Sequence, residues 1–159
     1  QPDYVPRMRT DSVALIQALY QRGYRILYLT ARSEDLELVD GTMAREATET
    51  WLVDQGFPMN PDRTDVVLSA VSHTGDDAAT AAYKLDALVT RQGAGWEFLY
   101  AFGNATTDAS AYVEAGIALD RIFMIGELAG DQGTVAVAGE GWTDVLATEL
   151  TPLPRICDF

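Results

Sequence analysis

The sequence is poor in cysteine, histidine and lysine, and each shortage excludes a kind of site. Cys157 is the only cysteine and His73 the only histidine, so the chain holds no internal disulfide and no metal site built from several Cys and His ligands. We therefore predict that His73 is a loop residue and not a metal ligand. Ten of the eleven basic residues are Arg, which leaves Lys84 as the only lysine.

Basic residues are also scarce. The sequence has 11 Lys and Arg against 24 Asp and Glu, which gives a formal net charge of -13. Nucleic acids and anionic membranes attract clustered Lys and Arg, so this balance argues against both as general partners. We expect no nucleic-acid partner. Any phosphate must then be bound by a few local residues.

Long apolar runs are absent as well. No run approaches the roughly 20 residues that a membrane-spanning helix needs, and residues 1–4 show no signal-peptide pattern, so the compartment stays open. A composition of 48% hydrophobic and 22% charged residues is ordinary for a folded domain. With 159 residues, we predict one domain over residues 1–159.

Strand and helix patterns alternate along the chain. Short apolar runs predict strands, and apolar residues at helical spacing predict helices. This alternation predicts an α/β fold, a three-layer sandwich with helices on both faces of a mostly parallel, Rossmann-like sheet. The predicted strands are residues 25–29, 65–69, 97–102, 121–125 and an edge strand at 134–138; the predicted helices are 11–22, 44–55, 77–91, 109–115 and 142–150, before a tail at 152–159.

Polar residues gather where the strand ending at Phe102 meets the next helix. Gly103 permits a sharp turn, and residues 104–108 then offer an amide, two hydroxyls and a carboxylate. The carboxyl ends of parallel strands are where α/β sheets bind ligands. The alternative is that Thr106, Thr107 or Asp108 only caps the helix.

Two further residues suit the same chemistry. Thr30 ends the strand at residues 25–29, and Lys84 lies near the middle of the helix at 77–91. A hydroxyl and an ammonium can bind phosphate oxygens, while Asn104 and Asp108 offer the oxygen ligands that Mg²⁺ prefers. Phosphoryl transfer otherwise needs mainly positioning and an in-line nucleophile. Alternatively, Lys84 belongs to a solvated helix face.

Three segments together carry a family resemblance. They are a strand ending in Thr-Ala-Arg at residues 24–32, a Tyr-Lys pair opening residues 83–88, and the Phe-Gly-Asn-Ala-Thr-Thr-Asp block at 102–108 with its continuation to residue 128. The chain resembles the haloacid-dehalogenase-like (HAD) phosphatases and, within them, the lipin/LNS2 group. The resemblance covers about residues 4–128, leaving 129–159 as a C-terminal extension. Ala105 departs from it, because lipins usually carry Arg there.

The resemblance implies a HAD-type sheet and a Mg²⁺-dependent phosphomonoester phosphatase, whose substrate would be phosphatidate or a small phosphorylated metabolite. Thr30 would bind the transferring phosphoryl group, and Lys84 would neutralise it and hold the nucleophile, so these two are the candidate catalytic residues. Asn104 and Asp108 would serve the Mg²⁺ ion. The candidate substrate-binding residues are Thr30, Ala31, Arg32 and Lys84.

The nucleophile that the resemblance implies is missing from this sequence. Family members carry Asp-x-Asp-x-Thr on a central first strand, and neither Asp3 nor Asp11 lies in such a motif. Residues 39–42 end in Asp-Gly-Thr, but Leu38 stands where the attacking Asp would be. In the family's sheet the first strand lies between the strands ending at Thr30 and Phe102. We therefore expect an upstream segment or a second chain to supply it.

Two other functions stay open. LNS2 domains of phosphatidylinositol-transfer proteins resemble this sequence, lack the catalytic aspartates and bind phosphatidic acid, so the chain could be an inactive module that binds a phospholipid or another phosphorylated ligand. The net charge disfavours an anionic membrane and so favours the enzyme. A degenerate fold kept for protein interaction is the third reading, which a Lys84 pointing away from the strand end would favour.

Overall fold

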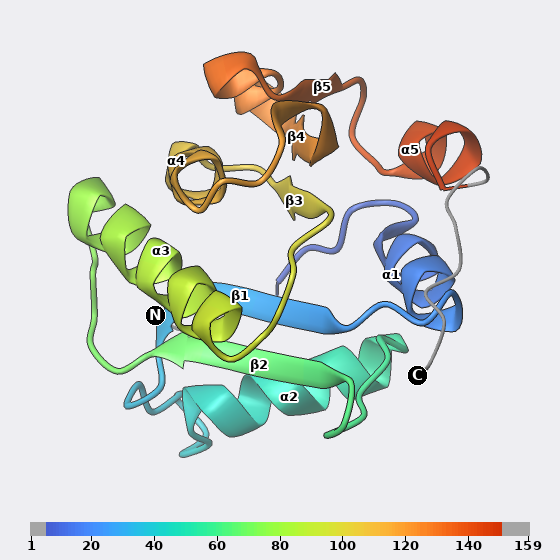
Figure 1. The fold of residues 1–159 in the computed structure, drawn as a ribbon. Coiled ribbons are helices and arrows are strands. Elements are labelled where there is room, and N and C mark those ends of the chain that lie inside the picture. The colour runs from blue at the N-terminus through green and yellow to red at the C-terminus, as the bar shows by residue number, and fades with distance from the viewer. Residues whose placement is uncertain (1–5, 151–159) are drawn as a thin grey trace. The chain divides into compact units, whose positions relative to one another are not determined.

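The computed structural model describes residues 6–150, so the predicted tail at 152–159, with Cys157, lies outside the described residues. Helices and strands alternate as the sequence predicts (Figure 1). The described residues fall into two compact units, one made of residues 6–72 with 141–150 and the other of residues 73–140. The elements are α1 Ser12–Gln21, β1 Ile26–Ser33, α2 Ala44–Gln55, β2 Thr64–Ser69, α3 Asp77–Gly93, β3 Ala101–Gly103, α4 Thr106–Glu114, β4 Ile122–Ile125, β5 Val135–Val137 and α5 Thr143–Thr148.

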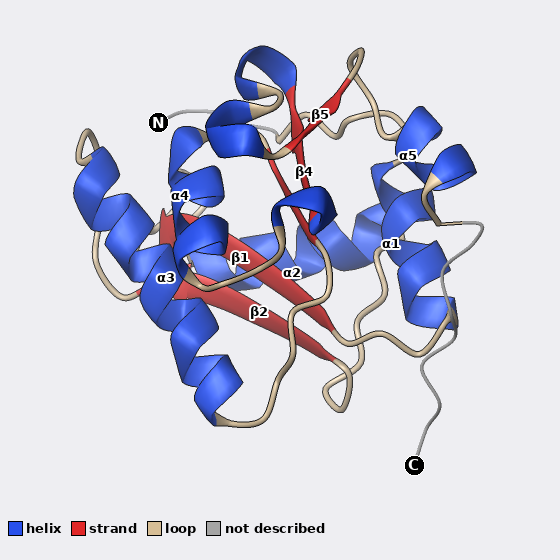
Figure 2. Cartoon of the chain, turned by 45° about the horizontal axis from the view of Figure 1, so that its top comes forward, coloured by secondary structure: helices blue, strands red, loops and turns tan. Residues whose placement is uncertain are grey.

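All strand pairs within the two sheets are parallel, which confirms the α/β class and the parallel pairing. The order is β1-β2 in the first unit and β3-β4-β5 in the second (Figure 2). Among the described residues, β1 and β3 therefore each have a strand partner on one side only. The prediction that residues 1–159 form one domain stays a prediction. Within residues 6–150, none of the helices has the length and apolar composition to cross a bilayer.

The first unit has its core between α2 and the two-stranded sheet. Ala44 and Leu52 of α2 pack against Val66 and Leu68 of β2. The buried residues of α2 recur at helical spacing and those of β2 at strand spacing. Helix α2 has the bounds that the sequence predicts, and Gly56 follows its last residue. Burial raises the pKa of Tyr28, whose hydroxyl donates to the carbonyl oxygen of Pro58 at 2.8 Å.

The first unit is closed by residues from both ends of the described chain. The N–H of Trp142 donates to the carbonyl oxygen of Thr10 at 2.9 Å, and the hydroxyl of Thr143 donates to Asp11 Oδ2 at 2.6 Å. These bonds join the start of α1 to the start of α5. The C-terminal extension after residue 128 is thus divided, because β5 belongs to the second unit and α5 to the first.

The second unit packs α4 against its three-stranded sheet. Ala109 of α4 lies in one buried cluster with Ala101 of β3 and Met124 of β4. Helix α3 packs against α4, and Gln92 Nε2 donates to the carbonyl oxygen of Ala115 at 2.9 Å. This bond joins the C-terminal ends of α3 and α4.

Two boundaries in the second unit differ from the prediction by three or more residues. Strand β3 has only three residues, because pairing with β4 begins at Ala101↔Ile122 and residues 97–100 have no ladder partner. Helix α4 begins at Thr106, three residues before the predicted start at 109. Asp108 therefore lies in the first turn of α4, where its carboxylate accepts the N–H of Ala105.

Candidate functional site

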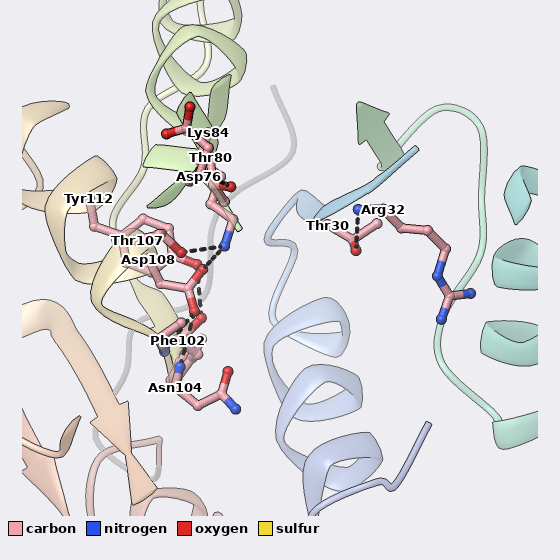
Figure 3. Close-up of polar contacts among 11 residues, drawn as sticks. Thr30, Arg32, Asp76, Thr80, Lys84, Phe102, Asn104, Thr107, Asp108 and Tyr112 are labelled. Atoms are coloured by element: carbon pink, nitrogen blue, oxygen red, sulfur yellow. Dashed lines mark hydrogen bonds and ion pairs between the residues drawn. The ribbon is translucent and has the colours of Figure 1, made fainter. Parts of the chain in front are cut away.

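The second unit contains a buried ion pair at the carboxyl end of β3. Lys84 is only 7% exposed, and its Nζ donates to Asp108 Oδ1 at 2.6 Å and to Thr107 Oγ1 at 3.0 Å (Figure 3). Ala87 and Leu88, three and four residues further along α3, are buried beside it. Lys84 thus lies on the packed face of its helix, which contradicts the reading of a solvated face.

The second oxygen of Asp108 organises the turn between β3 and α4. Oδ2 accepts the N–H groups of Asn104 and Ala105, both at 3.1 Å. The first N–H groups of a helix have no partner within the helix, and a carboxylate there is also favoured by the helix dipole. Asp108 therefore caps α4 and pairs with Lys84 at the same time, so the two readings of this residue from the sequence are compatible.

Gly103 is required by the closeness of Asp108. A Cβ atom at Gly103 would lie 2.7 Å from Asp108 Cβ and 2.9 Å from Asp108 Oδ2, distances that real Cβ atoms do not tolerate. Gly103 is not among the glycines with positive φ. The sequence predicted a sharp turn at this glycine, whereas the structure shows that its lack of a side chain makes room for the carboxylate.

Two residues of this cluster were missed as site residues by the sequence analysis. Thr107 was considered as one of the hydroxyls at the strand end or as a helix cap but was not chosen as a site residue, and it is the second acceptor for Lys84. Tyr112 follows Asp108 by one helical turn, and its hydroxyl donates to the carbonyl oxygen of Phe102 at 2.9 Å. Burial, and then the charge of Asp108, raise the pKa of Tyr112. The spacing of four residues from Asp108 was the only signal for Tyr112.

The residues predicted to hold Mg²⁺ do not fit that ion by themselves. Oδ1 of Asp108 accepts from an ammonium and Oδ2 accepts from two N–H groups, whereas Mg²⁺ needs carboxylate oxygens open to it. Asn104 contacts Asp108 through its backbone, and its side chain extends away from Lys84 (Figure 3). Residues 6–150 contain no group of three or more His, Cys, Asp or Glu placed to hold a metal ion.

The other predicted phosphate-binding residues lie together in the first unit. Strand β1 pairs regularly with β2 up to Leu29↔Val67, and pairing resumes at Ser33↔Ser69, so residues 30–32 form a bulge. Within it, the N–H of Arg32 donates to Thr30 Oγ1 at 3.3 Å. Arg32 also reaches Thr48 of α2, with its Nη1 3.4 Å from Thr48 Oγ1. Bulges of this kind are frequent beside active sites.

His73, predicted as a loop residue, is outside the named helices and strands. Its ring stacks on that of Tyr83, with centroids 5.5 Å apart and planes at 30°. Tyr83 directly precedes Lys84, so this contact braces the exposed side of α3 at the site. The ring contact gives His73 a packing role.

The first unit thus has a threonine-bearing bulge in a parallel strand, the second has a buried Lys–Asp pair after a parallel strand, and both belong to the Rossmann-like α/β class. The family model described as "PITM 1-3, LNS2 domain" matches residues 3–126. The chain therefore belongs to the LNS2 family, in the lipin/LNS2 group of the HAD-like superfamily, which confirms the resemblance predicted over about residues 4–128. A comparison with curated protein sequences gave no significant match.

Proposed function

We propose that this chain recognises a phosphomonoester, either a phosphatidate headgroup or a small phosphorylated molecule, and that Lys84 is its central phosphate-binding residue. One observation carries this proposal. Lysine has three N–H donors, and within the described residues Lys84 uses two of them, on Asp108 and Thr107. The third donor is left for a phosphate oxygen at the carboxyl end of β3, where α/β sheets bind ligands.

The charges of Lys84 and Asp108 determine which further groups the site needs in order to bind a phosphate. Lys84 and Asp108 are together neutral, so the ammonium offers a fixed donor and little surplus charge. The N–H groups at the start of α4, a helix of nine residues, favour an anion and can supply further donors. We propose Thr30, Ala31 and Arg32 as a second group of phosphate-binding residues, through a hydroxyl, a backbone amide and a guanidinium.

A Mg²⁺-dependent phosphatase is the second candidate function. The observation that favours it is an unpaired strand edge. Among residues 6–150, β1 and β3 each have a strand partner on one side only, and a strand carrying the attacking Asp could pair with such an edge. We propose that an upstream segment or a second chain supplies that strand. Phosphate recognition is favoured over hydrolysis because both oxygens of Asp108 already have partners.

Isothermal titration calorimetry with a short-chain phosphatidate and with inorganic phosphate tests the recognition proposal. The double variant Lys84→Met with Asp108→Asn removes both charges of the pair together, a change that buried pairs often tolerate. We expect it to fold and to lose phosphate binding. Arg121→Met, which removes an exposed positive charge that lies over the ring of Tyr100, is the matched control and should bind as the wild type does.

Turnover separates the two candidates. The wild-type chain, combined with the upstream segment or second chain that would carry the attacking Asp, is assayed for inorganic phosphate released from the same phosphatidate with and without Mg²⁺. Binding without release supports recognition alone, whereas Mg²⁺-dependent release that the double variant abolishes would establish the phosphatase. A folded double variant that binds phosphate with an unchanged Kd would contradict the assignment of Lys84.

A further inference from the structure

The loop between β1 and α2 forms a closed hairpin over residues 36–43. Glu37 and Met43 make an antiparallel bridge. The N–H of Gly41 donates to the carbonyl oxygen of Leu38 at 2.9 Å, and the N–H of Leu38 donates to the carbonyl oxygen of Thr42 at 2.8 Å. Gly41 has a φ of 85°, the left-handed conformation that ends a three-residue hairpin loop. The Asp-Gly-Thr sequence that imitates a catalytic motif is therefore a structural turn.

This hairpin presents aliphatic side chains to solvent. Val39 at its tip is 78% exposed, Leu36 is 47% exposed and Met43 is 40% exposed. Among residues 6–150, eight large hydrophobic side chains are exposed. Three of them lie in this one hairpin, within residues 36–43. Exposed apolar side chains that gather in one place mark interaction surfaces, and these three belong to one hairpin.

The same segment is uniformly acidic. Residues 34–43 contain Glu34, Asp35, Glu37 and Asp40 and no basic residue. Arg45 pairs only with Glu34 of these four, at 3.1 Å, and its other carboxylate partner is Glu49 on its own helix. Hydrogen bonding from Thr42 lowers the pKa of Asp40, so its carboxylate is charged at neutral pH. Aliphatic side chains are thus surrounded by negative charges that have no partner of opposite sign within the hairpin.

We propose that the 36–43 hairpin docks a segment of another protein that combines aliphatic side chains with Lys or Arg. Charge complementarity selects this partner. An anionic membrane would be repelled by the carboxylates of Asp35, Glu37 and Asp40, and a second copy of a chain with a net charge of -13 would be repelled as well. The hairpin's backbone is already closed by its own hydrogen bonds, so binding would cost little ordering entropy.

The test selects peptides from a phage-displayed library of random 12-residue sequences on the immobilised wild-type chain, and measures each selected peptide by fluorescence anisotropy. We expect the peptides to be enriched in both aliphatic and basic residues. Val39→Ser and Met43→Ser should each weaken binding about tenfold, equivalent to about 1.4 kcal/mol. Asp35→Asn with Glu37→Gln should weaken binding and reduce its dependence on salt.

The controls distinguish this surface from general stickiness. Val53→Ser removes a valine of α2 that is 58% exposed and should leave binding unchanged. Met43 is the residue before the first turn of α2, where serine is a preferred cap, so unfolding of that variant is not expected. The proposal is overturned if the peptides bind the hairpin variants as tightly as the wild type, or if they lack basic residues. Val39-dependent binding to phosphatidylcholine vesicles, or Val39-dependent dimerisation in sedimentation analysis, would also overturn it by identifying another occupant.

Discussion

Lys84 Nζ lies 2.6 Å from Asp108 Oδ1, and both side chains are almost fully buried. A charge removed from water is stable only while its partner is present, so each residue depends on the other. The pair also joins α3 to the capped start of α4. The integrity of the candidate site and the stability of the second unit are therefore linked through one contact.

Asp108→Ala should be strongly destabilising. It leaves the ammonium of Lys84 buried without a counter-ion and frees two N–H groups of the turn, so we expect the free energy of unfolding to fall by about 3–5 kcal/mol. Urea denaturation followed by circular dichroism measures this change. Lys84→Met with Asp108→Asn should lose much less. A loss of only about 1 kcal/mol in Asp108→Ala would indicate that the residue acts as a helix cap alone.

Gly103→Ala should damage the site although it adds a single methyl group. The new Cβ would lie 2.7 Å from Asp108 Cβ, and overpacking of this kind costs about 1–3 kcal/mol. The matched control is Gly93→Ala at the end of α3, where no atom lies within 4 Å of the added Cβ and alanine should be neutral or slightly stabilising. Equal melting temperatures of the two variants would contradict the close approach at Gly103.

Thr107→Val tests the second partner of Lys84. Valine keeps the shape of threonine but removes the acceptor 3.0 Å from Lys84 Nζ, so a buried donor loses its partner at a cost of about 1–3 kcal/mol. Thr106→Val makes the same substitution at the preceding, exposed position of α4. We expect it to change the free energy of unfolding by less than about 0.5 kcal/mol. A comparable loss in both variants would show that helix propensity, and not the bond to Lys84, is responsible.

Stability should decrease in alkali through Tyr112. Its pKa in the folded chain is raised above the ordinary value by burial and by Asp108, so above about pH 10 the unfolded chain loses a proton that the folded chain retains. The contribution of Tyr112 to the free energy of unfolding is therefore fully present below about pH 10 and is lost as the pH rises further. Between about pH 9 and pH 11, the free energy of unfolding measured by denaturation should fall less steeply in Tyr112→Phe than in the wild type. Tyr28, whose pKa is also raised, should account for another part of the fall. An unchanged slope in the variant would argue against this role of Tyr112.

The sequence predicted the order and type of the elements because their local signals are strong. Helix α2 has the predicted bounds, since its apolar positions and Gly56 mark both its face and its end. Strand β3 was predicted too long, because an apolar run does not reveal where a neighbouring strand begins to pair. Local pattern thus decides the kind of element, and tertiary pairing decides its length.

The candidate site was predicted as a set of residues but not as a set of contacts. Lys84 and Asp108 were both singled out, yet the sequence analysis assigned one to phosphate and the other to Mg²⁺. Their direct pairing joins residues 24 positions apart and depends on how α3 packs against α4, which periodicity does not determine. Residues 39–42 were rejected as a catalytic motif because Leu38 stands where the attacking Asp would be, and the exposure of Val39 in the hairpin at residues 36–43 was not predicted, because solvent exposure cannot be read from sequence neighbours.

The bonds between the start of α1 and the start of α5 have a consequence for how the chain is made. Ribosomal synthesis completes residues 73–140 before Gly141 appears, and domains generally fold as they emerge. The bond from Trp142 to the carbonyl oxygen of Thr10 therefore forms only after residues 73–140 have been synthesised, so this closure of the first unit is a late step in the making of the chain.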